Sequence, residues 1–296
     1  MELTSYSVVI ATCDRPGPLE LALASIADQR EGPAQVVVVD SSPNRVSEEV
    51  CRKFGDRFNL TYIRSDLRSA AKQRNLGARS VTTALILFCD DDVVLPPDVL
   101  GKLKSVFASN SNVGGVAGRI VDLAHPPPRR LLRWYYRLQA GYDHPNYGGK
   151  LFGPAINCLP CHLASDPELI EADWLNSTCT MYDRALFERE LFPEFDGYSP
   201  FEDVHLSARI GRTHRLFFHN TAIYEHRSQS SDLKRNAFAL NRMAQRNRLI
   251  VAREVMRVPR ITLLWKDFVH RLFLSLVTVR SRHNGWGQAV LGLWTS

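Results

Sequence analysis

The chain has 296 residues, of which 45% are hydrophobic and 23% are charged, a composition that fits one large or two smaller globular domains. It contains no run of about 18 apolar residues, which argues against a membrane-spanning helix, and its first residues lack the pattern of a secretory signal. The net charge of +6 is uneven, because the stretch from Arg227 onwards holds 13 Lys or Arg and 3 Asp or Glu, whereas the rest is acidic overall.

The first third of the chain alternates apolar runs of strand length with helical segments. The run at 35–40 is nearly all valine before Asp40, as expected for a parallel strand buried on both faces. Strand–helix alternation at this spacing predicts βαβ units and a parallel sheet. We expect strands at 7–11, 35–40, 60–63 and 84–89, and helices at 19–29, 47–54 and 69–78.

The remainder of the chain is less regular. The prolines at 126–128 and the segment 142–149 are typical of loops, and 174–182 is a further apolar segment. Glu202 and Asp203 begin a predicted helix, where acidic side chains favour the helix dipole. We expect strands at 115–121, 216–218 and 222–224, helices at 184–190 and 202–210, and a helical pattern from 233 to the end.

Three adjacent carboxylates, Asp90, Asp91 and Asp92, separate the apolar run 84–89 from a second run at 93–95. The C-terminal end of a buried parallel strand faces the crevice where open α/β sheets bind ligands. Three neighbouring negative charges repel one another, and Mg²⁺ or Mn²⁺ is their natural partner because it shares its shell between carboxylates, water and phosphate oxygens. The alternative is a solvated acidic loop.

Two further polar residues, Thr12 and Asp40, also end predicted strands. At the carboxyl edge of a parallel sheet they would line the same crevice as the three aspartates. A buried carboxylate without a partner is costly, so we expect Asp40 either to cap the following helix or to accept hydrogen bonds from a ligand.

Six segments form an ordered series of motifs, from a strand and turn near the N-terminus to a histidine that ends a strand. They are Val8–Pro16, Val36–Ser42, Lys72–Gly77, Phe88–Asp92, Phe201–Arg209 and Tyr224–His226. Together they resemble the motifs of glycosyltransferase family 2, the inverting enzymes with a GT-A fold, over about residues 5–250. The tripeptide at 173–175 is similar to that of rhamnosyltransferase-like members.

The resemblance implies an α/β fold of the GT-A type, with a Rossmann-like, mostly parallel central sheet flanked by helices. The catalytic domain would span 1–230, with a nucleotide-sugar half at about 1–122 and an acceptor half at about 123–230. A helical, amphipathic, basic region would follow at 231–296. The implied reaction moves a sugar from a UDP or dTDP donor to a hydroxyl of a glycan or lipid-linked acceptor, in the assembly of cell-surface polysaccharide.

The same resemblance implies roles for single residues. Asp203 would be the general base that takes a proton from the acceptor hydroxyl, with Glu202 beside it in the catalytic group. Asp92 would bind a divalent metal that offsets charge on the diphosphate, with His226 near that metal. Asp40 would bind the nucleotide base, and Asp90 would lie near the ribose and sugar. The nucleotide-sugar site would comprise Thr12, Asp40, Arg74, Asp90 and Asp91.

Plainer interpretations remain open for several of these residues. Arg74 could be a surface charge on a helix, Glu202 a helix-terminal charge, and His226 a structural hydrogen-bonding group. His205 stands where the family pattern has a second acid, which puts in doubt how the helix of Asp203 is held. Asn176 and its neighbour also depart from the pattern, so the acceptor pocket is the least defined part.

Two other functions are compatible with such a chain. A catalytically inactive nucleotide-sugar-binding or scaffold protein would not need both Asp92 and Asp203. A sugar nucleotidyltransferase should have a Gly-rich loop with Arg and Lys after its first strand, and Thr12–Pro18 has one Arg and one Gly.

The segment Cys158–His162 spells a haem-attachment motif, but that attachment requires an exported protein. A zinc site would need two more ligands, and only Cys179 and His144 are near in sequence. We expect a loop with chance thiols. Six scattered cysteines without a signal indicate a reducing, cytoplasmic setting.

The basic C-terminal stretch predicts an electrostatic partner of its own. A helix over 233–254 would place Arg235, Arg242, Arg246 and Arg253 on one face, and the segment 261–279 repeats apolar residues at helical spacing. An anionic membrane surface at the cytoplasmic face is one candidate partner. The alternative is a helix packed on the catalytic domain with a solvated basic face. No nucleic-acid motif is present, so nucleic acid is not an expected partner.

Overall fold

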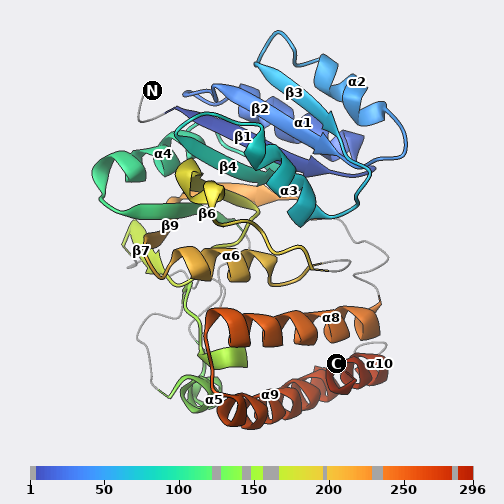
Figure 1. Cartoon of the computed structure of the whole chain (residues 1–296), viewed down its shortest axis with the longest axis vertical. Helices are drawn as coiled ribbons and strands as arrows, with labels where there is room; N and C mark the ends of the chain where they lie inside the picture. The colour runs from blue at the N-terminus through green and yellow to red at the C-terminus, as the bar shows by residue number, and fades with distance from the viewer. Residues whose placement is uncertain are drawn as a thin grey trace.

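The structure is a computed structural model that describes residues 5–121, 128–141, 148–155, 167–195, 199–228, 236–281 and 286–295. A sheet flanked by helices forms one end of the molecule, and helices from the C-terminal region are stacked at the other end (Figure 1). The chain is therefore an α/β protein with a helical C-terminal region, as the sequence predicts.

The N-terminal part of the sheet has the predicted alternation of strands and helices. Its elements are β1 (Tyr6–Thr12), α1 (Pro16–Ala27), β2 (Gln35–Asp40), α2 (Val46–Arg52), β3 (Leu60–Arg64), α3 (Ala70–Arg79) and β4 (Leu85–Asp90). β1 pairs in parallel with both β2 and β4, and β2 pairs in parallel with β3. The carboxyl ends of these strands therefore meet at one edge of the sheet, as expected for Thr12, Asp40 and Asp90.

The second half of the sheet is mixed. Its elements are β5 (Val93–Val94), α4 (Val99–Ser109), β6 (Val113–Ile120), α5 (Arg130–Ala140), β7 (Leu169–Ala172), β8 (Cys179–Asp183), α6 (Glu202–Ile210) and β9 (Arg215–His226), with 3₁₀ turns at Gly153–Ala155 and Arg184–Glu188. Within the described residues the strand order is β3-β2-β1-β4-β8-β6-β9-β5, and β7 pairs with β9. β8 runs antiparallel to β4 and β6, so the continuous parallel order ends at β4.

The two short strands predicted at 216–218 and 222–224 are one strand, β9. Its pairing with β6 shifts register between Gly118 and Arg119, which leaves a bulge at Asn220, Thr221 and Ala222. The Asn220 side chain donates to the Pro167 carbonyl at 2.6 Å, so the polar residues that suggested a turn instead hold the bulge. β7, α4 and α5 are not among the elements that the sequence predicts.

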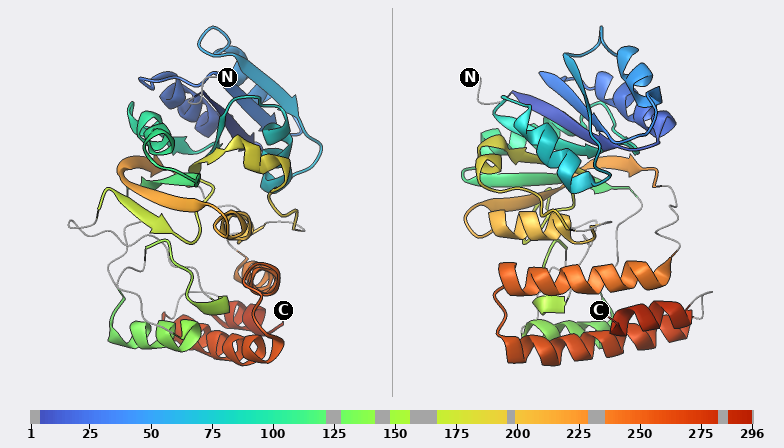
Figure 2. Two further views of the ribbon diagram at one scale, coloured as in Figure 1. Left: turned by 60° about the vertical axis from the view of Figure 1, so that its left-hand side comes forward. Right: turned by 45° about the vertical axis from the view of Figure 1, so that its right-hand side comes forward.

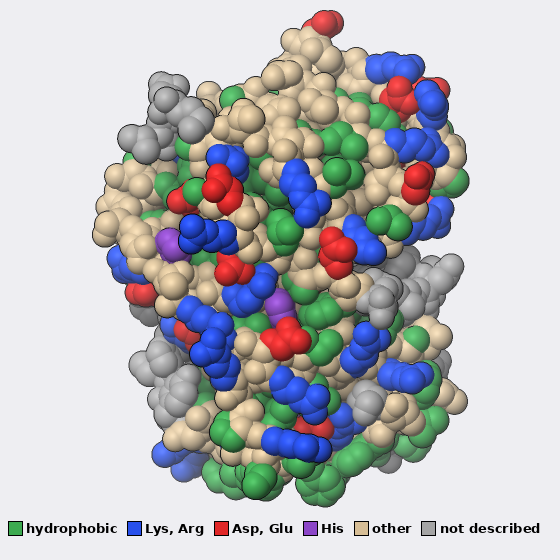
Figure 3. Space-filling view, viewed as in Figure 1, with side chains coloured by type: hydrophobic (Ala, Val, Ile, Leu, Met, Phe, Trp, Pro, Cys, Tyr) green, Lys and Arg blue, Asp and Glu red, His purple; other side chains and the backbone are tan. Residues whose placement is uncertain are grey.

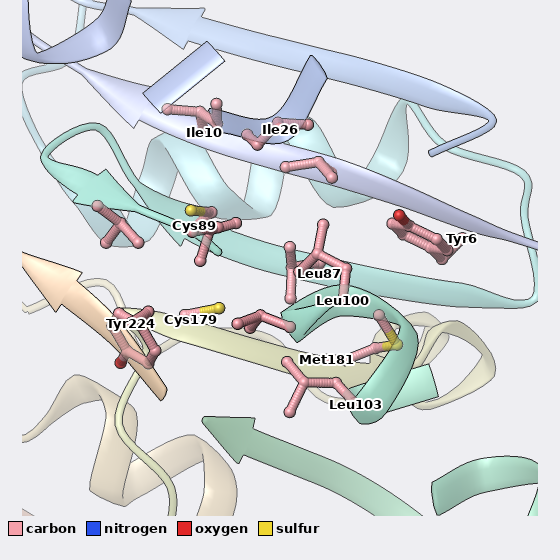
Figure 4. Close-up of a cluster of buried hydrophobic side chains, with 14 of the residues drawn as sticks. Tyr6, Ile10, Ile26, Leu87, Cys89, Leu100, Leu103, Cys179, Met181 and Tyr224 are labelled. Carbon is pink, nitrogen blue, oxygen red and sulfur yellow. The ribbon is translucent and has the colours of Figure 1, made fainter. Parts of the chain in front are cut away.

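Apolar side chains cover both faces of the sheet. On one face, residues of β1 and β4 pack against α1 and α4, which Figure 4 shows for Ile10, Ile26, Leu87 and Leu100. Within α4, Val99, Leu100, Leu103 and Val106 are buried, so this unpredicted helix contributes directly to the core. The other face carries a second cluster that includes Val9, Val37 and Phe88.

Helix α3 lies unusually close to the sheet at Gly77. A Cβ atom on Gly77 would lie 2.3 Å from Cγ1 of Val9, which is far inside van der Waals contact. The close approach lets the buried Gln73 side chain donate to the carbonyls of Thr12 and Val39, at 2.8 Å each. Gln73 therefore joins the ends of β1 and β2, and Gly77 makes that junction sterically possible.

The C-terminal region comprises α8 (Ala237–Ile250), a π-helical turn (Val251–Val255), α9 (Arg260–Ser281) and α10 (Trp286–Trp294). Figure 2 shows α8 between α6 and the α9–α10 layer. The π-helical turn packs on the sheet domain, where Val251 and Val255 join Trp174 and Val204 in one buried cluster. The helix predicted over 233–254 is thus α8 and this turn, and Arg235 lies outside the described residues. Among the described residues, none of the helices combines the length and the apolar character of a membrane span.

We predict that Gly77→Ala lowers the free energy of unfolding by about 1–3 kcal/mol, because the added methyl group overpacks the contact with Val9. Urea denaturation measures this. The cost should shrink in a Val9→Ala background, since the two residues share one contact. Gly17→Ala is the matched control, because a Cβ there meets nothing within 4 Å. Equal stability of Gly77→Ala and the wild type would contradict the tight α3–β1 packing.

Candidate active site

A short antiparallel bridge between β5 and β9 brings Asp92 and His226 together. Val93 pairs with His226, and the Arg227 N–H donates to the Asp92 carbonyl at 2.8 Å. His226 Nε2 then lies 3.1 Å from Asp92 Oδ1. With Asp90 these side chains form a group whose potential ligand atoms all lie within 4.8 Å of one another.

The donor set of this group fits a divalent cation. Two carboxylates with one imidazole suit Mn²⁺, and the carboxylates also suit Mg²⁺, which completes its shell with water and phosphate. The sequence places Asp92 and His226 in this role and assigns Asp90 to the ribose and sugar. The structure brings all three within reach of one ion.

Arg15 is the counter-ion of the aspartate cluster. It donates from Nη1 to Asp91 Oδ1 at 2.7 Å and from Nη2 to Asp92 Oδ2 at 2.5 Å. Burial would raise the pKa of Asp92, but His226 and Arg15 outweigh it and lower that pKa to about 2. The cluster is therefore not a solvated acidic loop, because both Asp91 and Asp92 are buried.

Asp91 faces the end of β1. Its Oδ2 accepts a hydrogen bond from Thr12 Oγ1 at 2.7 Å. Burial raises the pKa of Asp91 to about 7, although Arg15 and Thr12 act in the opposite direction. Thr12, predicted for the nucleotide site, is thus directly coupled to the aspartate cluster. Sequence reasoning did not select Arg15, although it lies in the first motif and three adjacent carboxylates call for a cation.

Arg74 is a buried cation that joins three elements. From α3, its Nη2 donates to Asp90 Oδ1 at the end of β4 at 2.7 Å, and its Nη1 donates to Glu202 Oε1 at the start of α6. Burial alone would lower the pKa of Arg74, but Glu202 and Asp90 outweigh it and raise it. The interpretation of Arg74 as a surface charge is therefore wrong. Its contacts connect the two acidic clusters that the sequence places far apart.

Glu202 and Asp203 form the first turn of α6. Burial raises the pKa of Glu202 to about 7, against the opposing effect of Arg74, and its Oε2 is buried without a hydrogen-bond partner. Burial raises the pKa of Asp203 to about 6, and the N–H of Val204 donates to its Oδ1 at 2.8 Å. Phe201, which precedes them, has φ of 71°, a left-handed conformation that costs about 1–2 kcal/mol for a residue with a Cβ.

Asp40 is satisfied by its own neighbourhood. Its Oδ1 accepts from the backbone N–H of Ser42 at 2.8 Å and from the Ser42 hydroxyl at 2.5 Å, and its Oδ2 accepts from the Tyr62 hydroxyl at 2.7 Å. Arg45, not Asp40, occupies the N-cap of α2, so the helix-capping interpretation is wrong. Arg74 contacts Asp90 and Glu202, whereas Asp40 is bonded to Ser42 and Tyr62.

His205, which replaces an acid of the family pattern, holds α6 to the C-terminal region. Its Nε2 lies 3.2 Å from Glu254 in the π-helical turn, and its ring is buried against Phe195. The departure from the pattern therefore changes how the helix is fixed and leaves Asp203 in place. The haem-like and zinc-like residues Cys158, Cys161, His162 and His144 lie outside the described residues.

The mixed α/β sheet, with acidic strand ends and a histidine beside them, fits the GT-A fold that the motifs predict. A sequence model of glycosyl transferase family 2 matches residues 7–160, more than half of the chain. The chain therefore belongs to this family. The match includes Thr12 to Asp92 and ends before Glu202, Asp203 and His226, so the match does not test the roles predicted for these three.

Two curated relatives match over shorter segments. An uncharacterized glycosyltransferase of Haemophilus influenzae is 29% identical over 108 residues, which is 36% of each chain. The validoxylamine A glucosyltransferase of Streptomyces hygroscopicus subsp. limoneus is 33% identical over 109 residues, which is 36% of this chain and 23% of that protein. The match thus spans about a third or less of either relative.

The fold is shared with solved structures. The mannosyltransferase PcManGT from Pyrobaculum calidifontis, solved in complex with GDP-Man and Mn²⁺, superposes with a TM-score of 0.57. Its sequence is 15% identical, and the comparison covers 97% of this chain and 85% of that one. Likeness at this level of identity shows the GT-A fold.

We predict that Arg74→Met destabilises the protein by about 3–5 kcal/mol, because it leaves the buried Glu202 carboxylate and the half-buried Asp90 without their partner. Denaturant unfolding measures the loss. Arg79→Met, on the same helix but exposed, is the matched control and should stay within about 0.5 kcal/mol of the wild type. Equal stability of the two variants would show that the bridge does not hold these elements together.

Proposed function

We propose that the protein is a metal-dependent, inverting glycosyltransferase that moves a sugar from a nucleoside-diphosphate donor to an acceptor hydroxyl. The observation that carries the proposal is the Arg74 bridge, which places the aspartate cluster and the first turn of α6 on the same buried guanidinium. One cluster can then serve the leaving nucleotide while the other serves the incoming alcohol.

On the donor side, Asp92 and His226, with Asp90 beside them, would hold Mg²⁺ or Mn²⁺. When bound, such an ion offsets the charge on the diphosphate. Arg15 pairs with Asp91 and Asp92, which keeps these two carboxylates compatible with burial. Asp40, at the end of β2 and hydrogen-bonded to Ser42 and Tyr62, would recognise the base, with Thr12 of the neighbouring strand beside it.

On the acceptor side, Asp203 is the general base. Attack with inversion must come from the face of the sugar opposite the leaving nucleotide, and a hydroxyl needs a proton acceptor to become an effective nucleophile. A pKa near 6 suits that task, because the carboxylate is ionised at neutral pH and still basic enough to accept a proton. Glu202, held by Arg74, lies beside Asp203 in the first turn of α6.

We infer a UDP or dTDP sugar as donor, a glycan or lipid-linked acceptor, and a role in cell-surface polysaccharide assembly at the cytoplasmic face of the membrane. The domain limits of 1–230 and 231–296 belong to the same proposal. They are supported by the break between β9 and α8, after which the described chain is helical. A thermal-shift screen of nucleotide sugars with and without Mn²⁺ would identify the donor, because a ligand of the native state raises its apparent stability.

We predict that kcat/KM rises with pH through about 6 and then levels off, since Asp203 must lose its proton to act as a base and its pKa is raised to about 6. Asp203→Asn should lower the rate by about 10²–10⁴ while donor binding survives. Steady-state assays from acidic to neutral pH measure both effects.

The control for this prediction is Asp56→Asn, which changes an exposed carboxylate and should leave both the rate and its pH profile unaltered. Near-normal turnover by Asp203→Asn would remove Asp203 from the base role. Donor binding by the wild type without any transfer or donor hydrolysis would instead favour the inactive binding protein.

We predict that Asp92→Asn and His226→Ala each weaken Mn²⁺ binding by about tenfold or more, because each removes one ligand of the group. Calorimetry in the presence of a nucleoside diphosphate measures the affinity. His214→Ala alters a histidine on the turn before β9 and should bind Mn²⁺ as the wild type does. If all three variants bind equally, the metal does not lie at this group.

A further inference from the structure

Helix α9 turns many of its large apolar side chains outward, which is unusual for a helix on the surface of a globular protein. Its inner side buries His270 and Arg271 beside Leu263, with Asp267 half-buried, whereas a helix on a globular protein usually buries a wholly apolar stripe. The outward side carries large apolar residues instead. By fraction of the residue exposed, they include Ile261 83%, Leu264 60%, Trp265 49%, Phe268 54%, Leu272 46% and Leu276 63%.

The polar groups on the inner side fix this orientation. Asp267 lies between Arg248 of α8 and Arg271, with its Oδ2 accepting from Arg271 at 2.8 Å. His270 Nδ1 lies 2.7 Å from the hydroxyl of Tyr135 on α5. Rotating α9 to bury its apolar side would break these buried contacts, which are costly to leave unpaired. The apolar side therefore stays outward.

Helices α5 and α10 extend the same surface. Tyr135 of α5 stacks on Phe273 of α9 with ring centroids 3.9 Å apart, and Trp294 of α10 donates to Ser275 of α9 at 3.0 Å. We call this surface the apolar end face. Figure 3 shows hydrophobic side chains gathered along the lower end of the molecule, where Figure 1 places α5, α9 and α10. Its exposed residues outside α9 include Leu131, Trp134, Trp286, Leu291 and Trp294.

These three helices carry a net positive charge. Their sequences contain seven Lys or Arg and one acid, Asp267, which is already bound between Arg248 and Arg271. Arg130, Arg133, Arg260 and Arg280 are exposed around the apolar residues. Exposed tryptophans with arginines beside an apolar surface are the composition of helices that lie in the headgroup region of a bilayer.

We propose that the apolar end face docks on an anionic lipid bilayer. Two observations favour the bilayer over a second copy of the chain. A second copy would bring the same basic helices against each other, whereas anionic headgroups complement them. The patch also contains the exposed residues Trp134, Trp265 and Trp294, whose amphipathic rings suit a water–lipid boundary. Docking does not require transfer activity, so it stands independently of the proposed function.

The test is co-sedimentation of the full chain, without donor or acceptor, with phosphatidylcholine vesicles that contain or lack phosphatidylglycerol. We expect binding to the anionic vesicles that weakens when salt is raised, because the electrostatic part is screened. In the triple variant Trp134→Ser, Leu264→Ser and Leu276→Ser, the lipid concentration at which half of the protein is bound should rise about tenfold or more. Because all three side chains are exposed, the variant should keep the wild-type melting temperature.

Leu21→Ser combined with Leu67→Ser is the matched control, since both residues are exposed and apolar but lie in the sheet domain. It should bind vesicles as the wild type does. If the triple variant melts early, Leu131→Ser alone serves in its place, because Leu131 is 79% exposed. Failure of the wild type to bind anionic vesicles, or equal binding by the end-face variants, overturns the proposal. So does a wild-type dimer that the triple variant converts to a monomer while neither binds lipid.

Discussion

The guanidinium of Arg74 connects the two halves of the candidate active site. It is buried, and it holds a carboxylate at the end of β4 and another at the start of α6. A buried charge is tolerable only where opposite charges and hydrogen bonds surround it. The burial of Arg74 therefore fixes the positions of α3, β4 and α6 relative to one another. The acidic residues at these two elements, far apart in sequence, consequently share one site.

Electrostatics and backbone pairing set the rest of the site. The β5–β9 bridge fixes where His226 meets Asp92, and Arg15 supplies the positive charge that lets Asp91 and Asp92 be buried side by side. The pKa of Asp92 is lowered, whereas the pKa values of Asp91, Glu202 and Asp203 are raised toward neutrality. The site therefore combines a carboxylate that is ionised at neutral pH with carboxyl groups that can exchange protons there. Such separation is what acid–base chemistry at neutral pH requires.

The sequence predicts the parallel N-terminal strands well because each is a run of aliphatic residues between turn residues, and the strand at 35–40 has the observed bounds. It does not predict α4, and it divides β9 into two strands because the polar residues of the bulge at Asn220 look like a turn. Short elements depend on tertiary packing, which a local pattern does not show. Ordered motifs indicated Asp92, Asp203 and His226, but no local pattern shows that Arg74 reaches Glu202 across 128 positions, or that α9 turns its apolar side outward. Those outcomes depend on long-range charge pairing.

The central claim is that the two acidic groups lie on opposite sides of one anomeric carbon and serve the same transfer. A crystal structure with a nucleotide sugar and Mn²⁺ tests this most directly. The account predicts the diphosphate and the ion at Asp92 and His226, with the Asp203 carboxylate on the other side of the anomeric carbon and Arg74 still bridging Asp90 and Glu202. A donor bound away from Asp92, or a sugar that leaves Asp203 outside the occupied cleft, would contradict it.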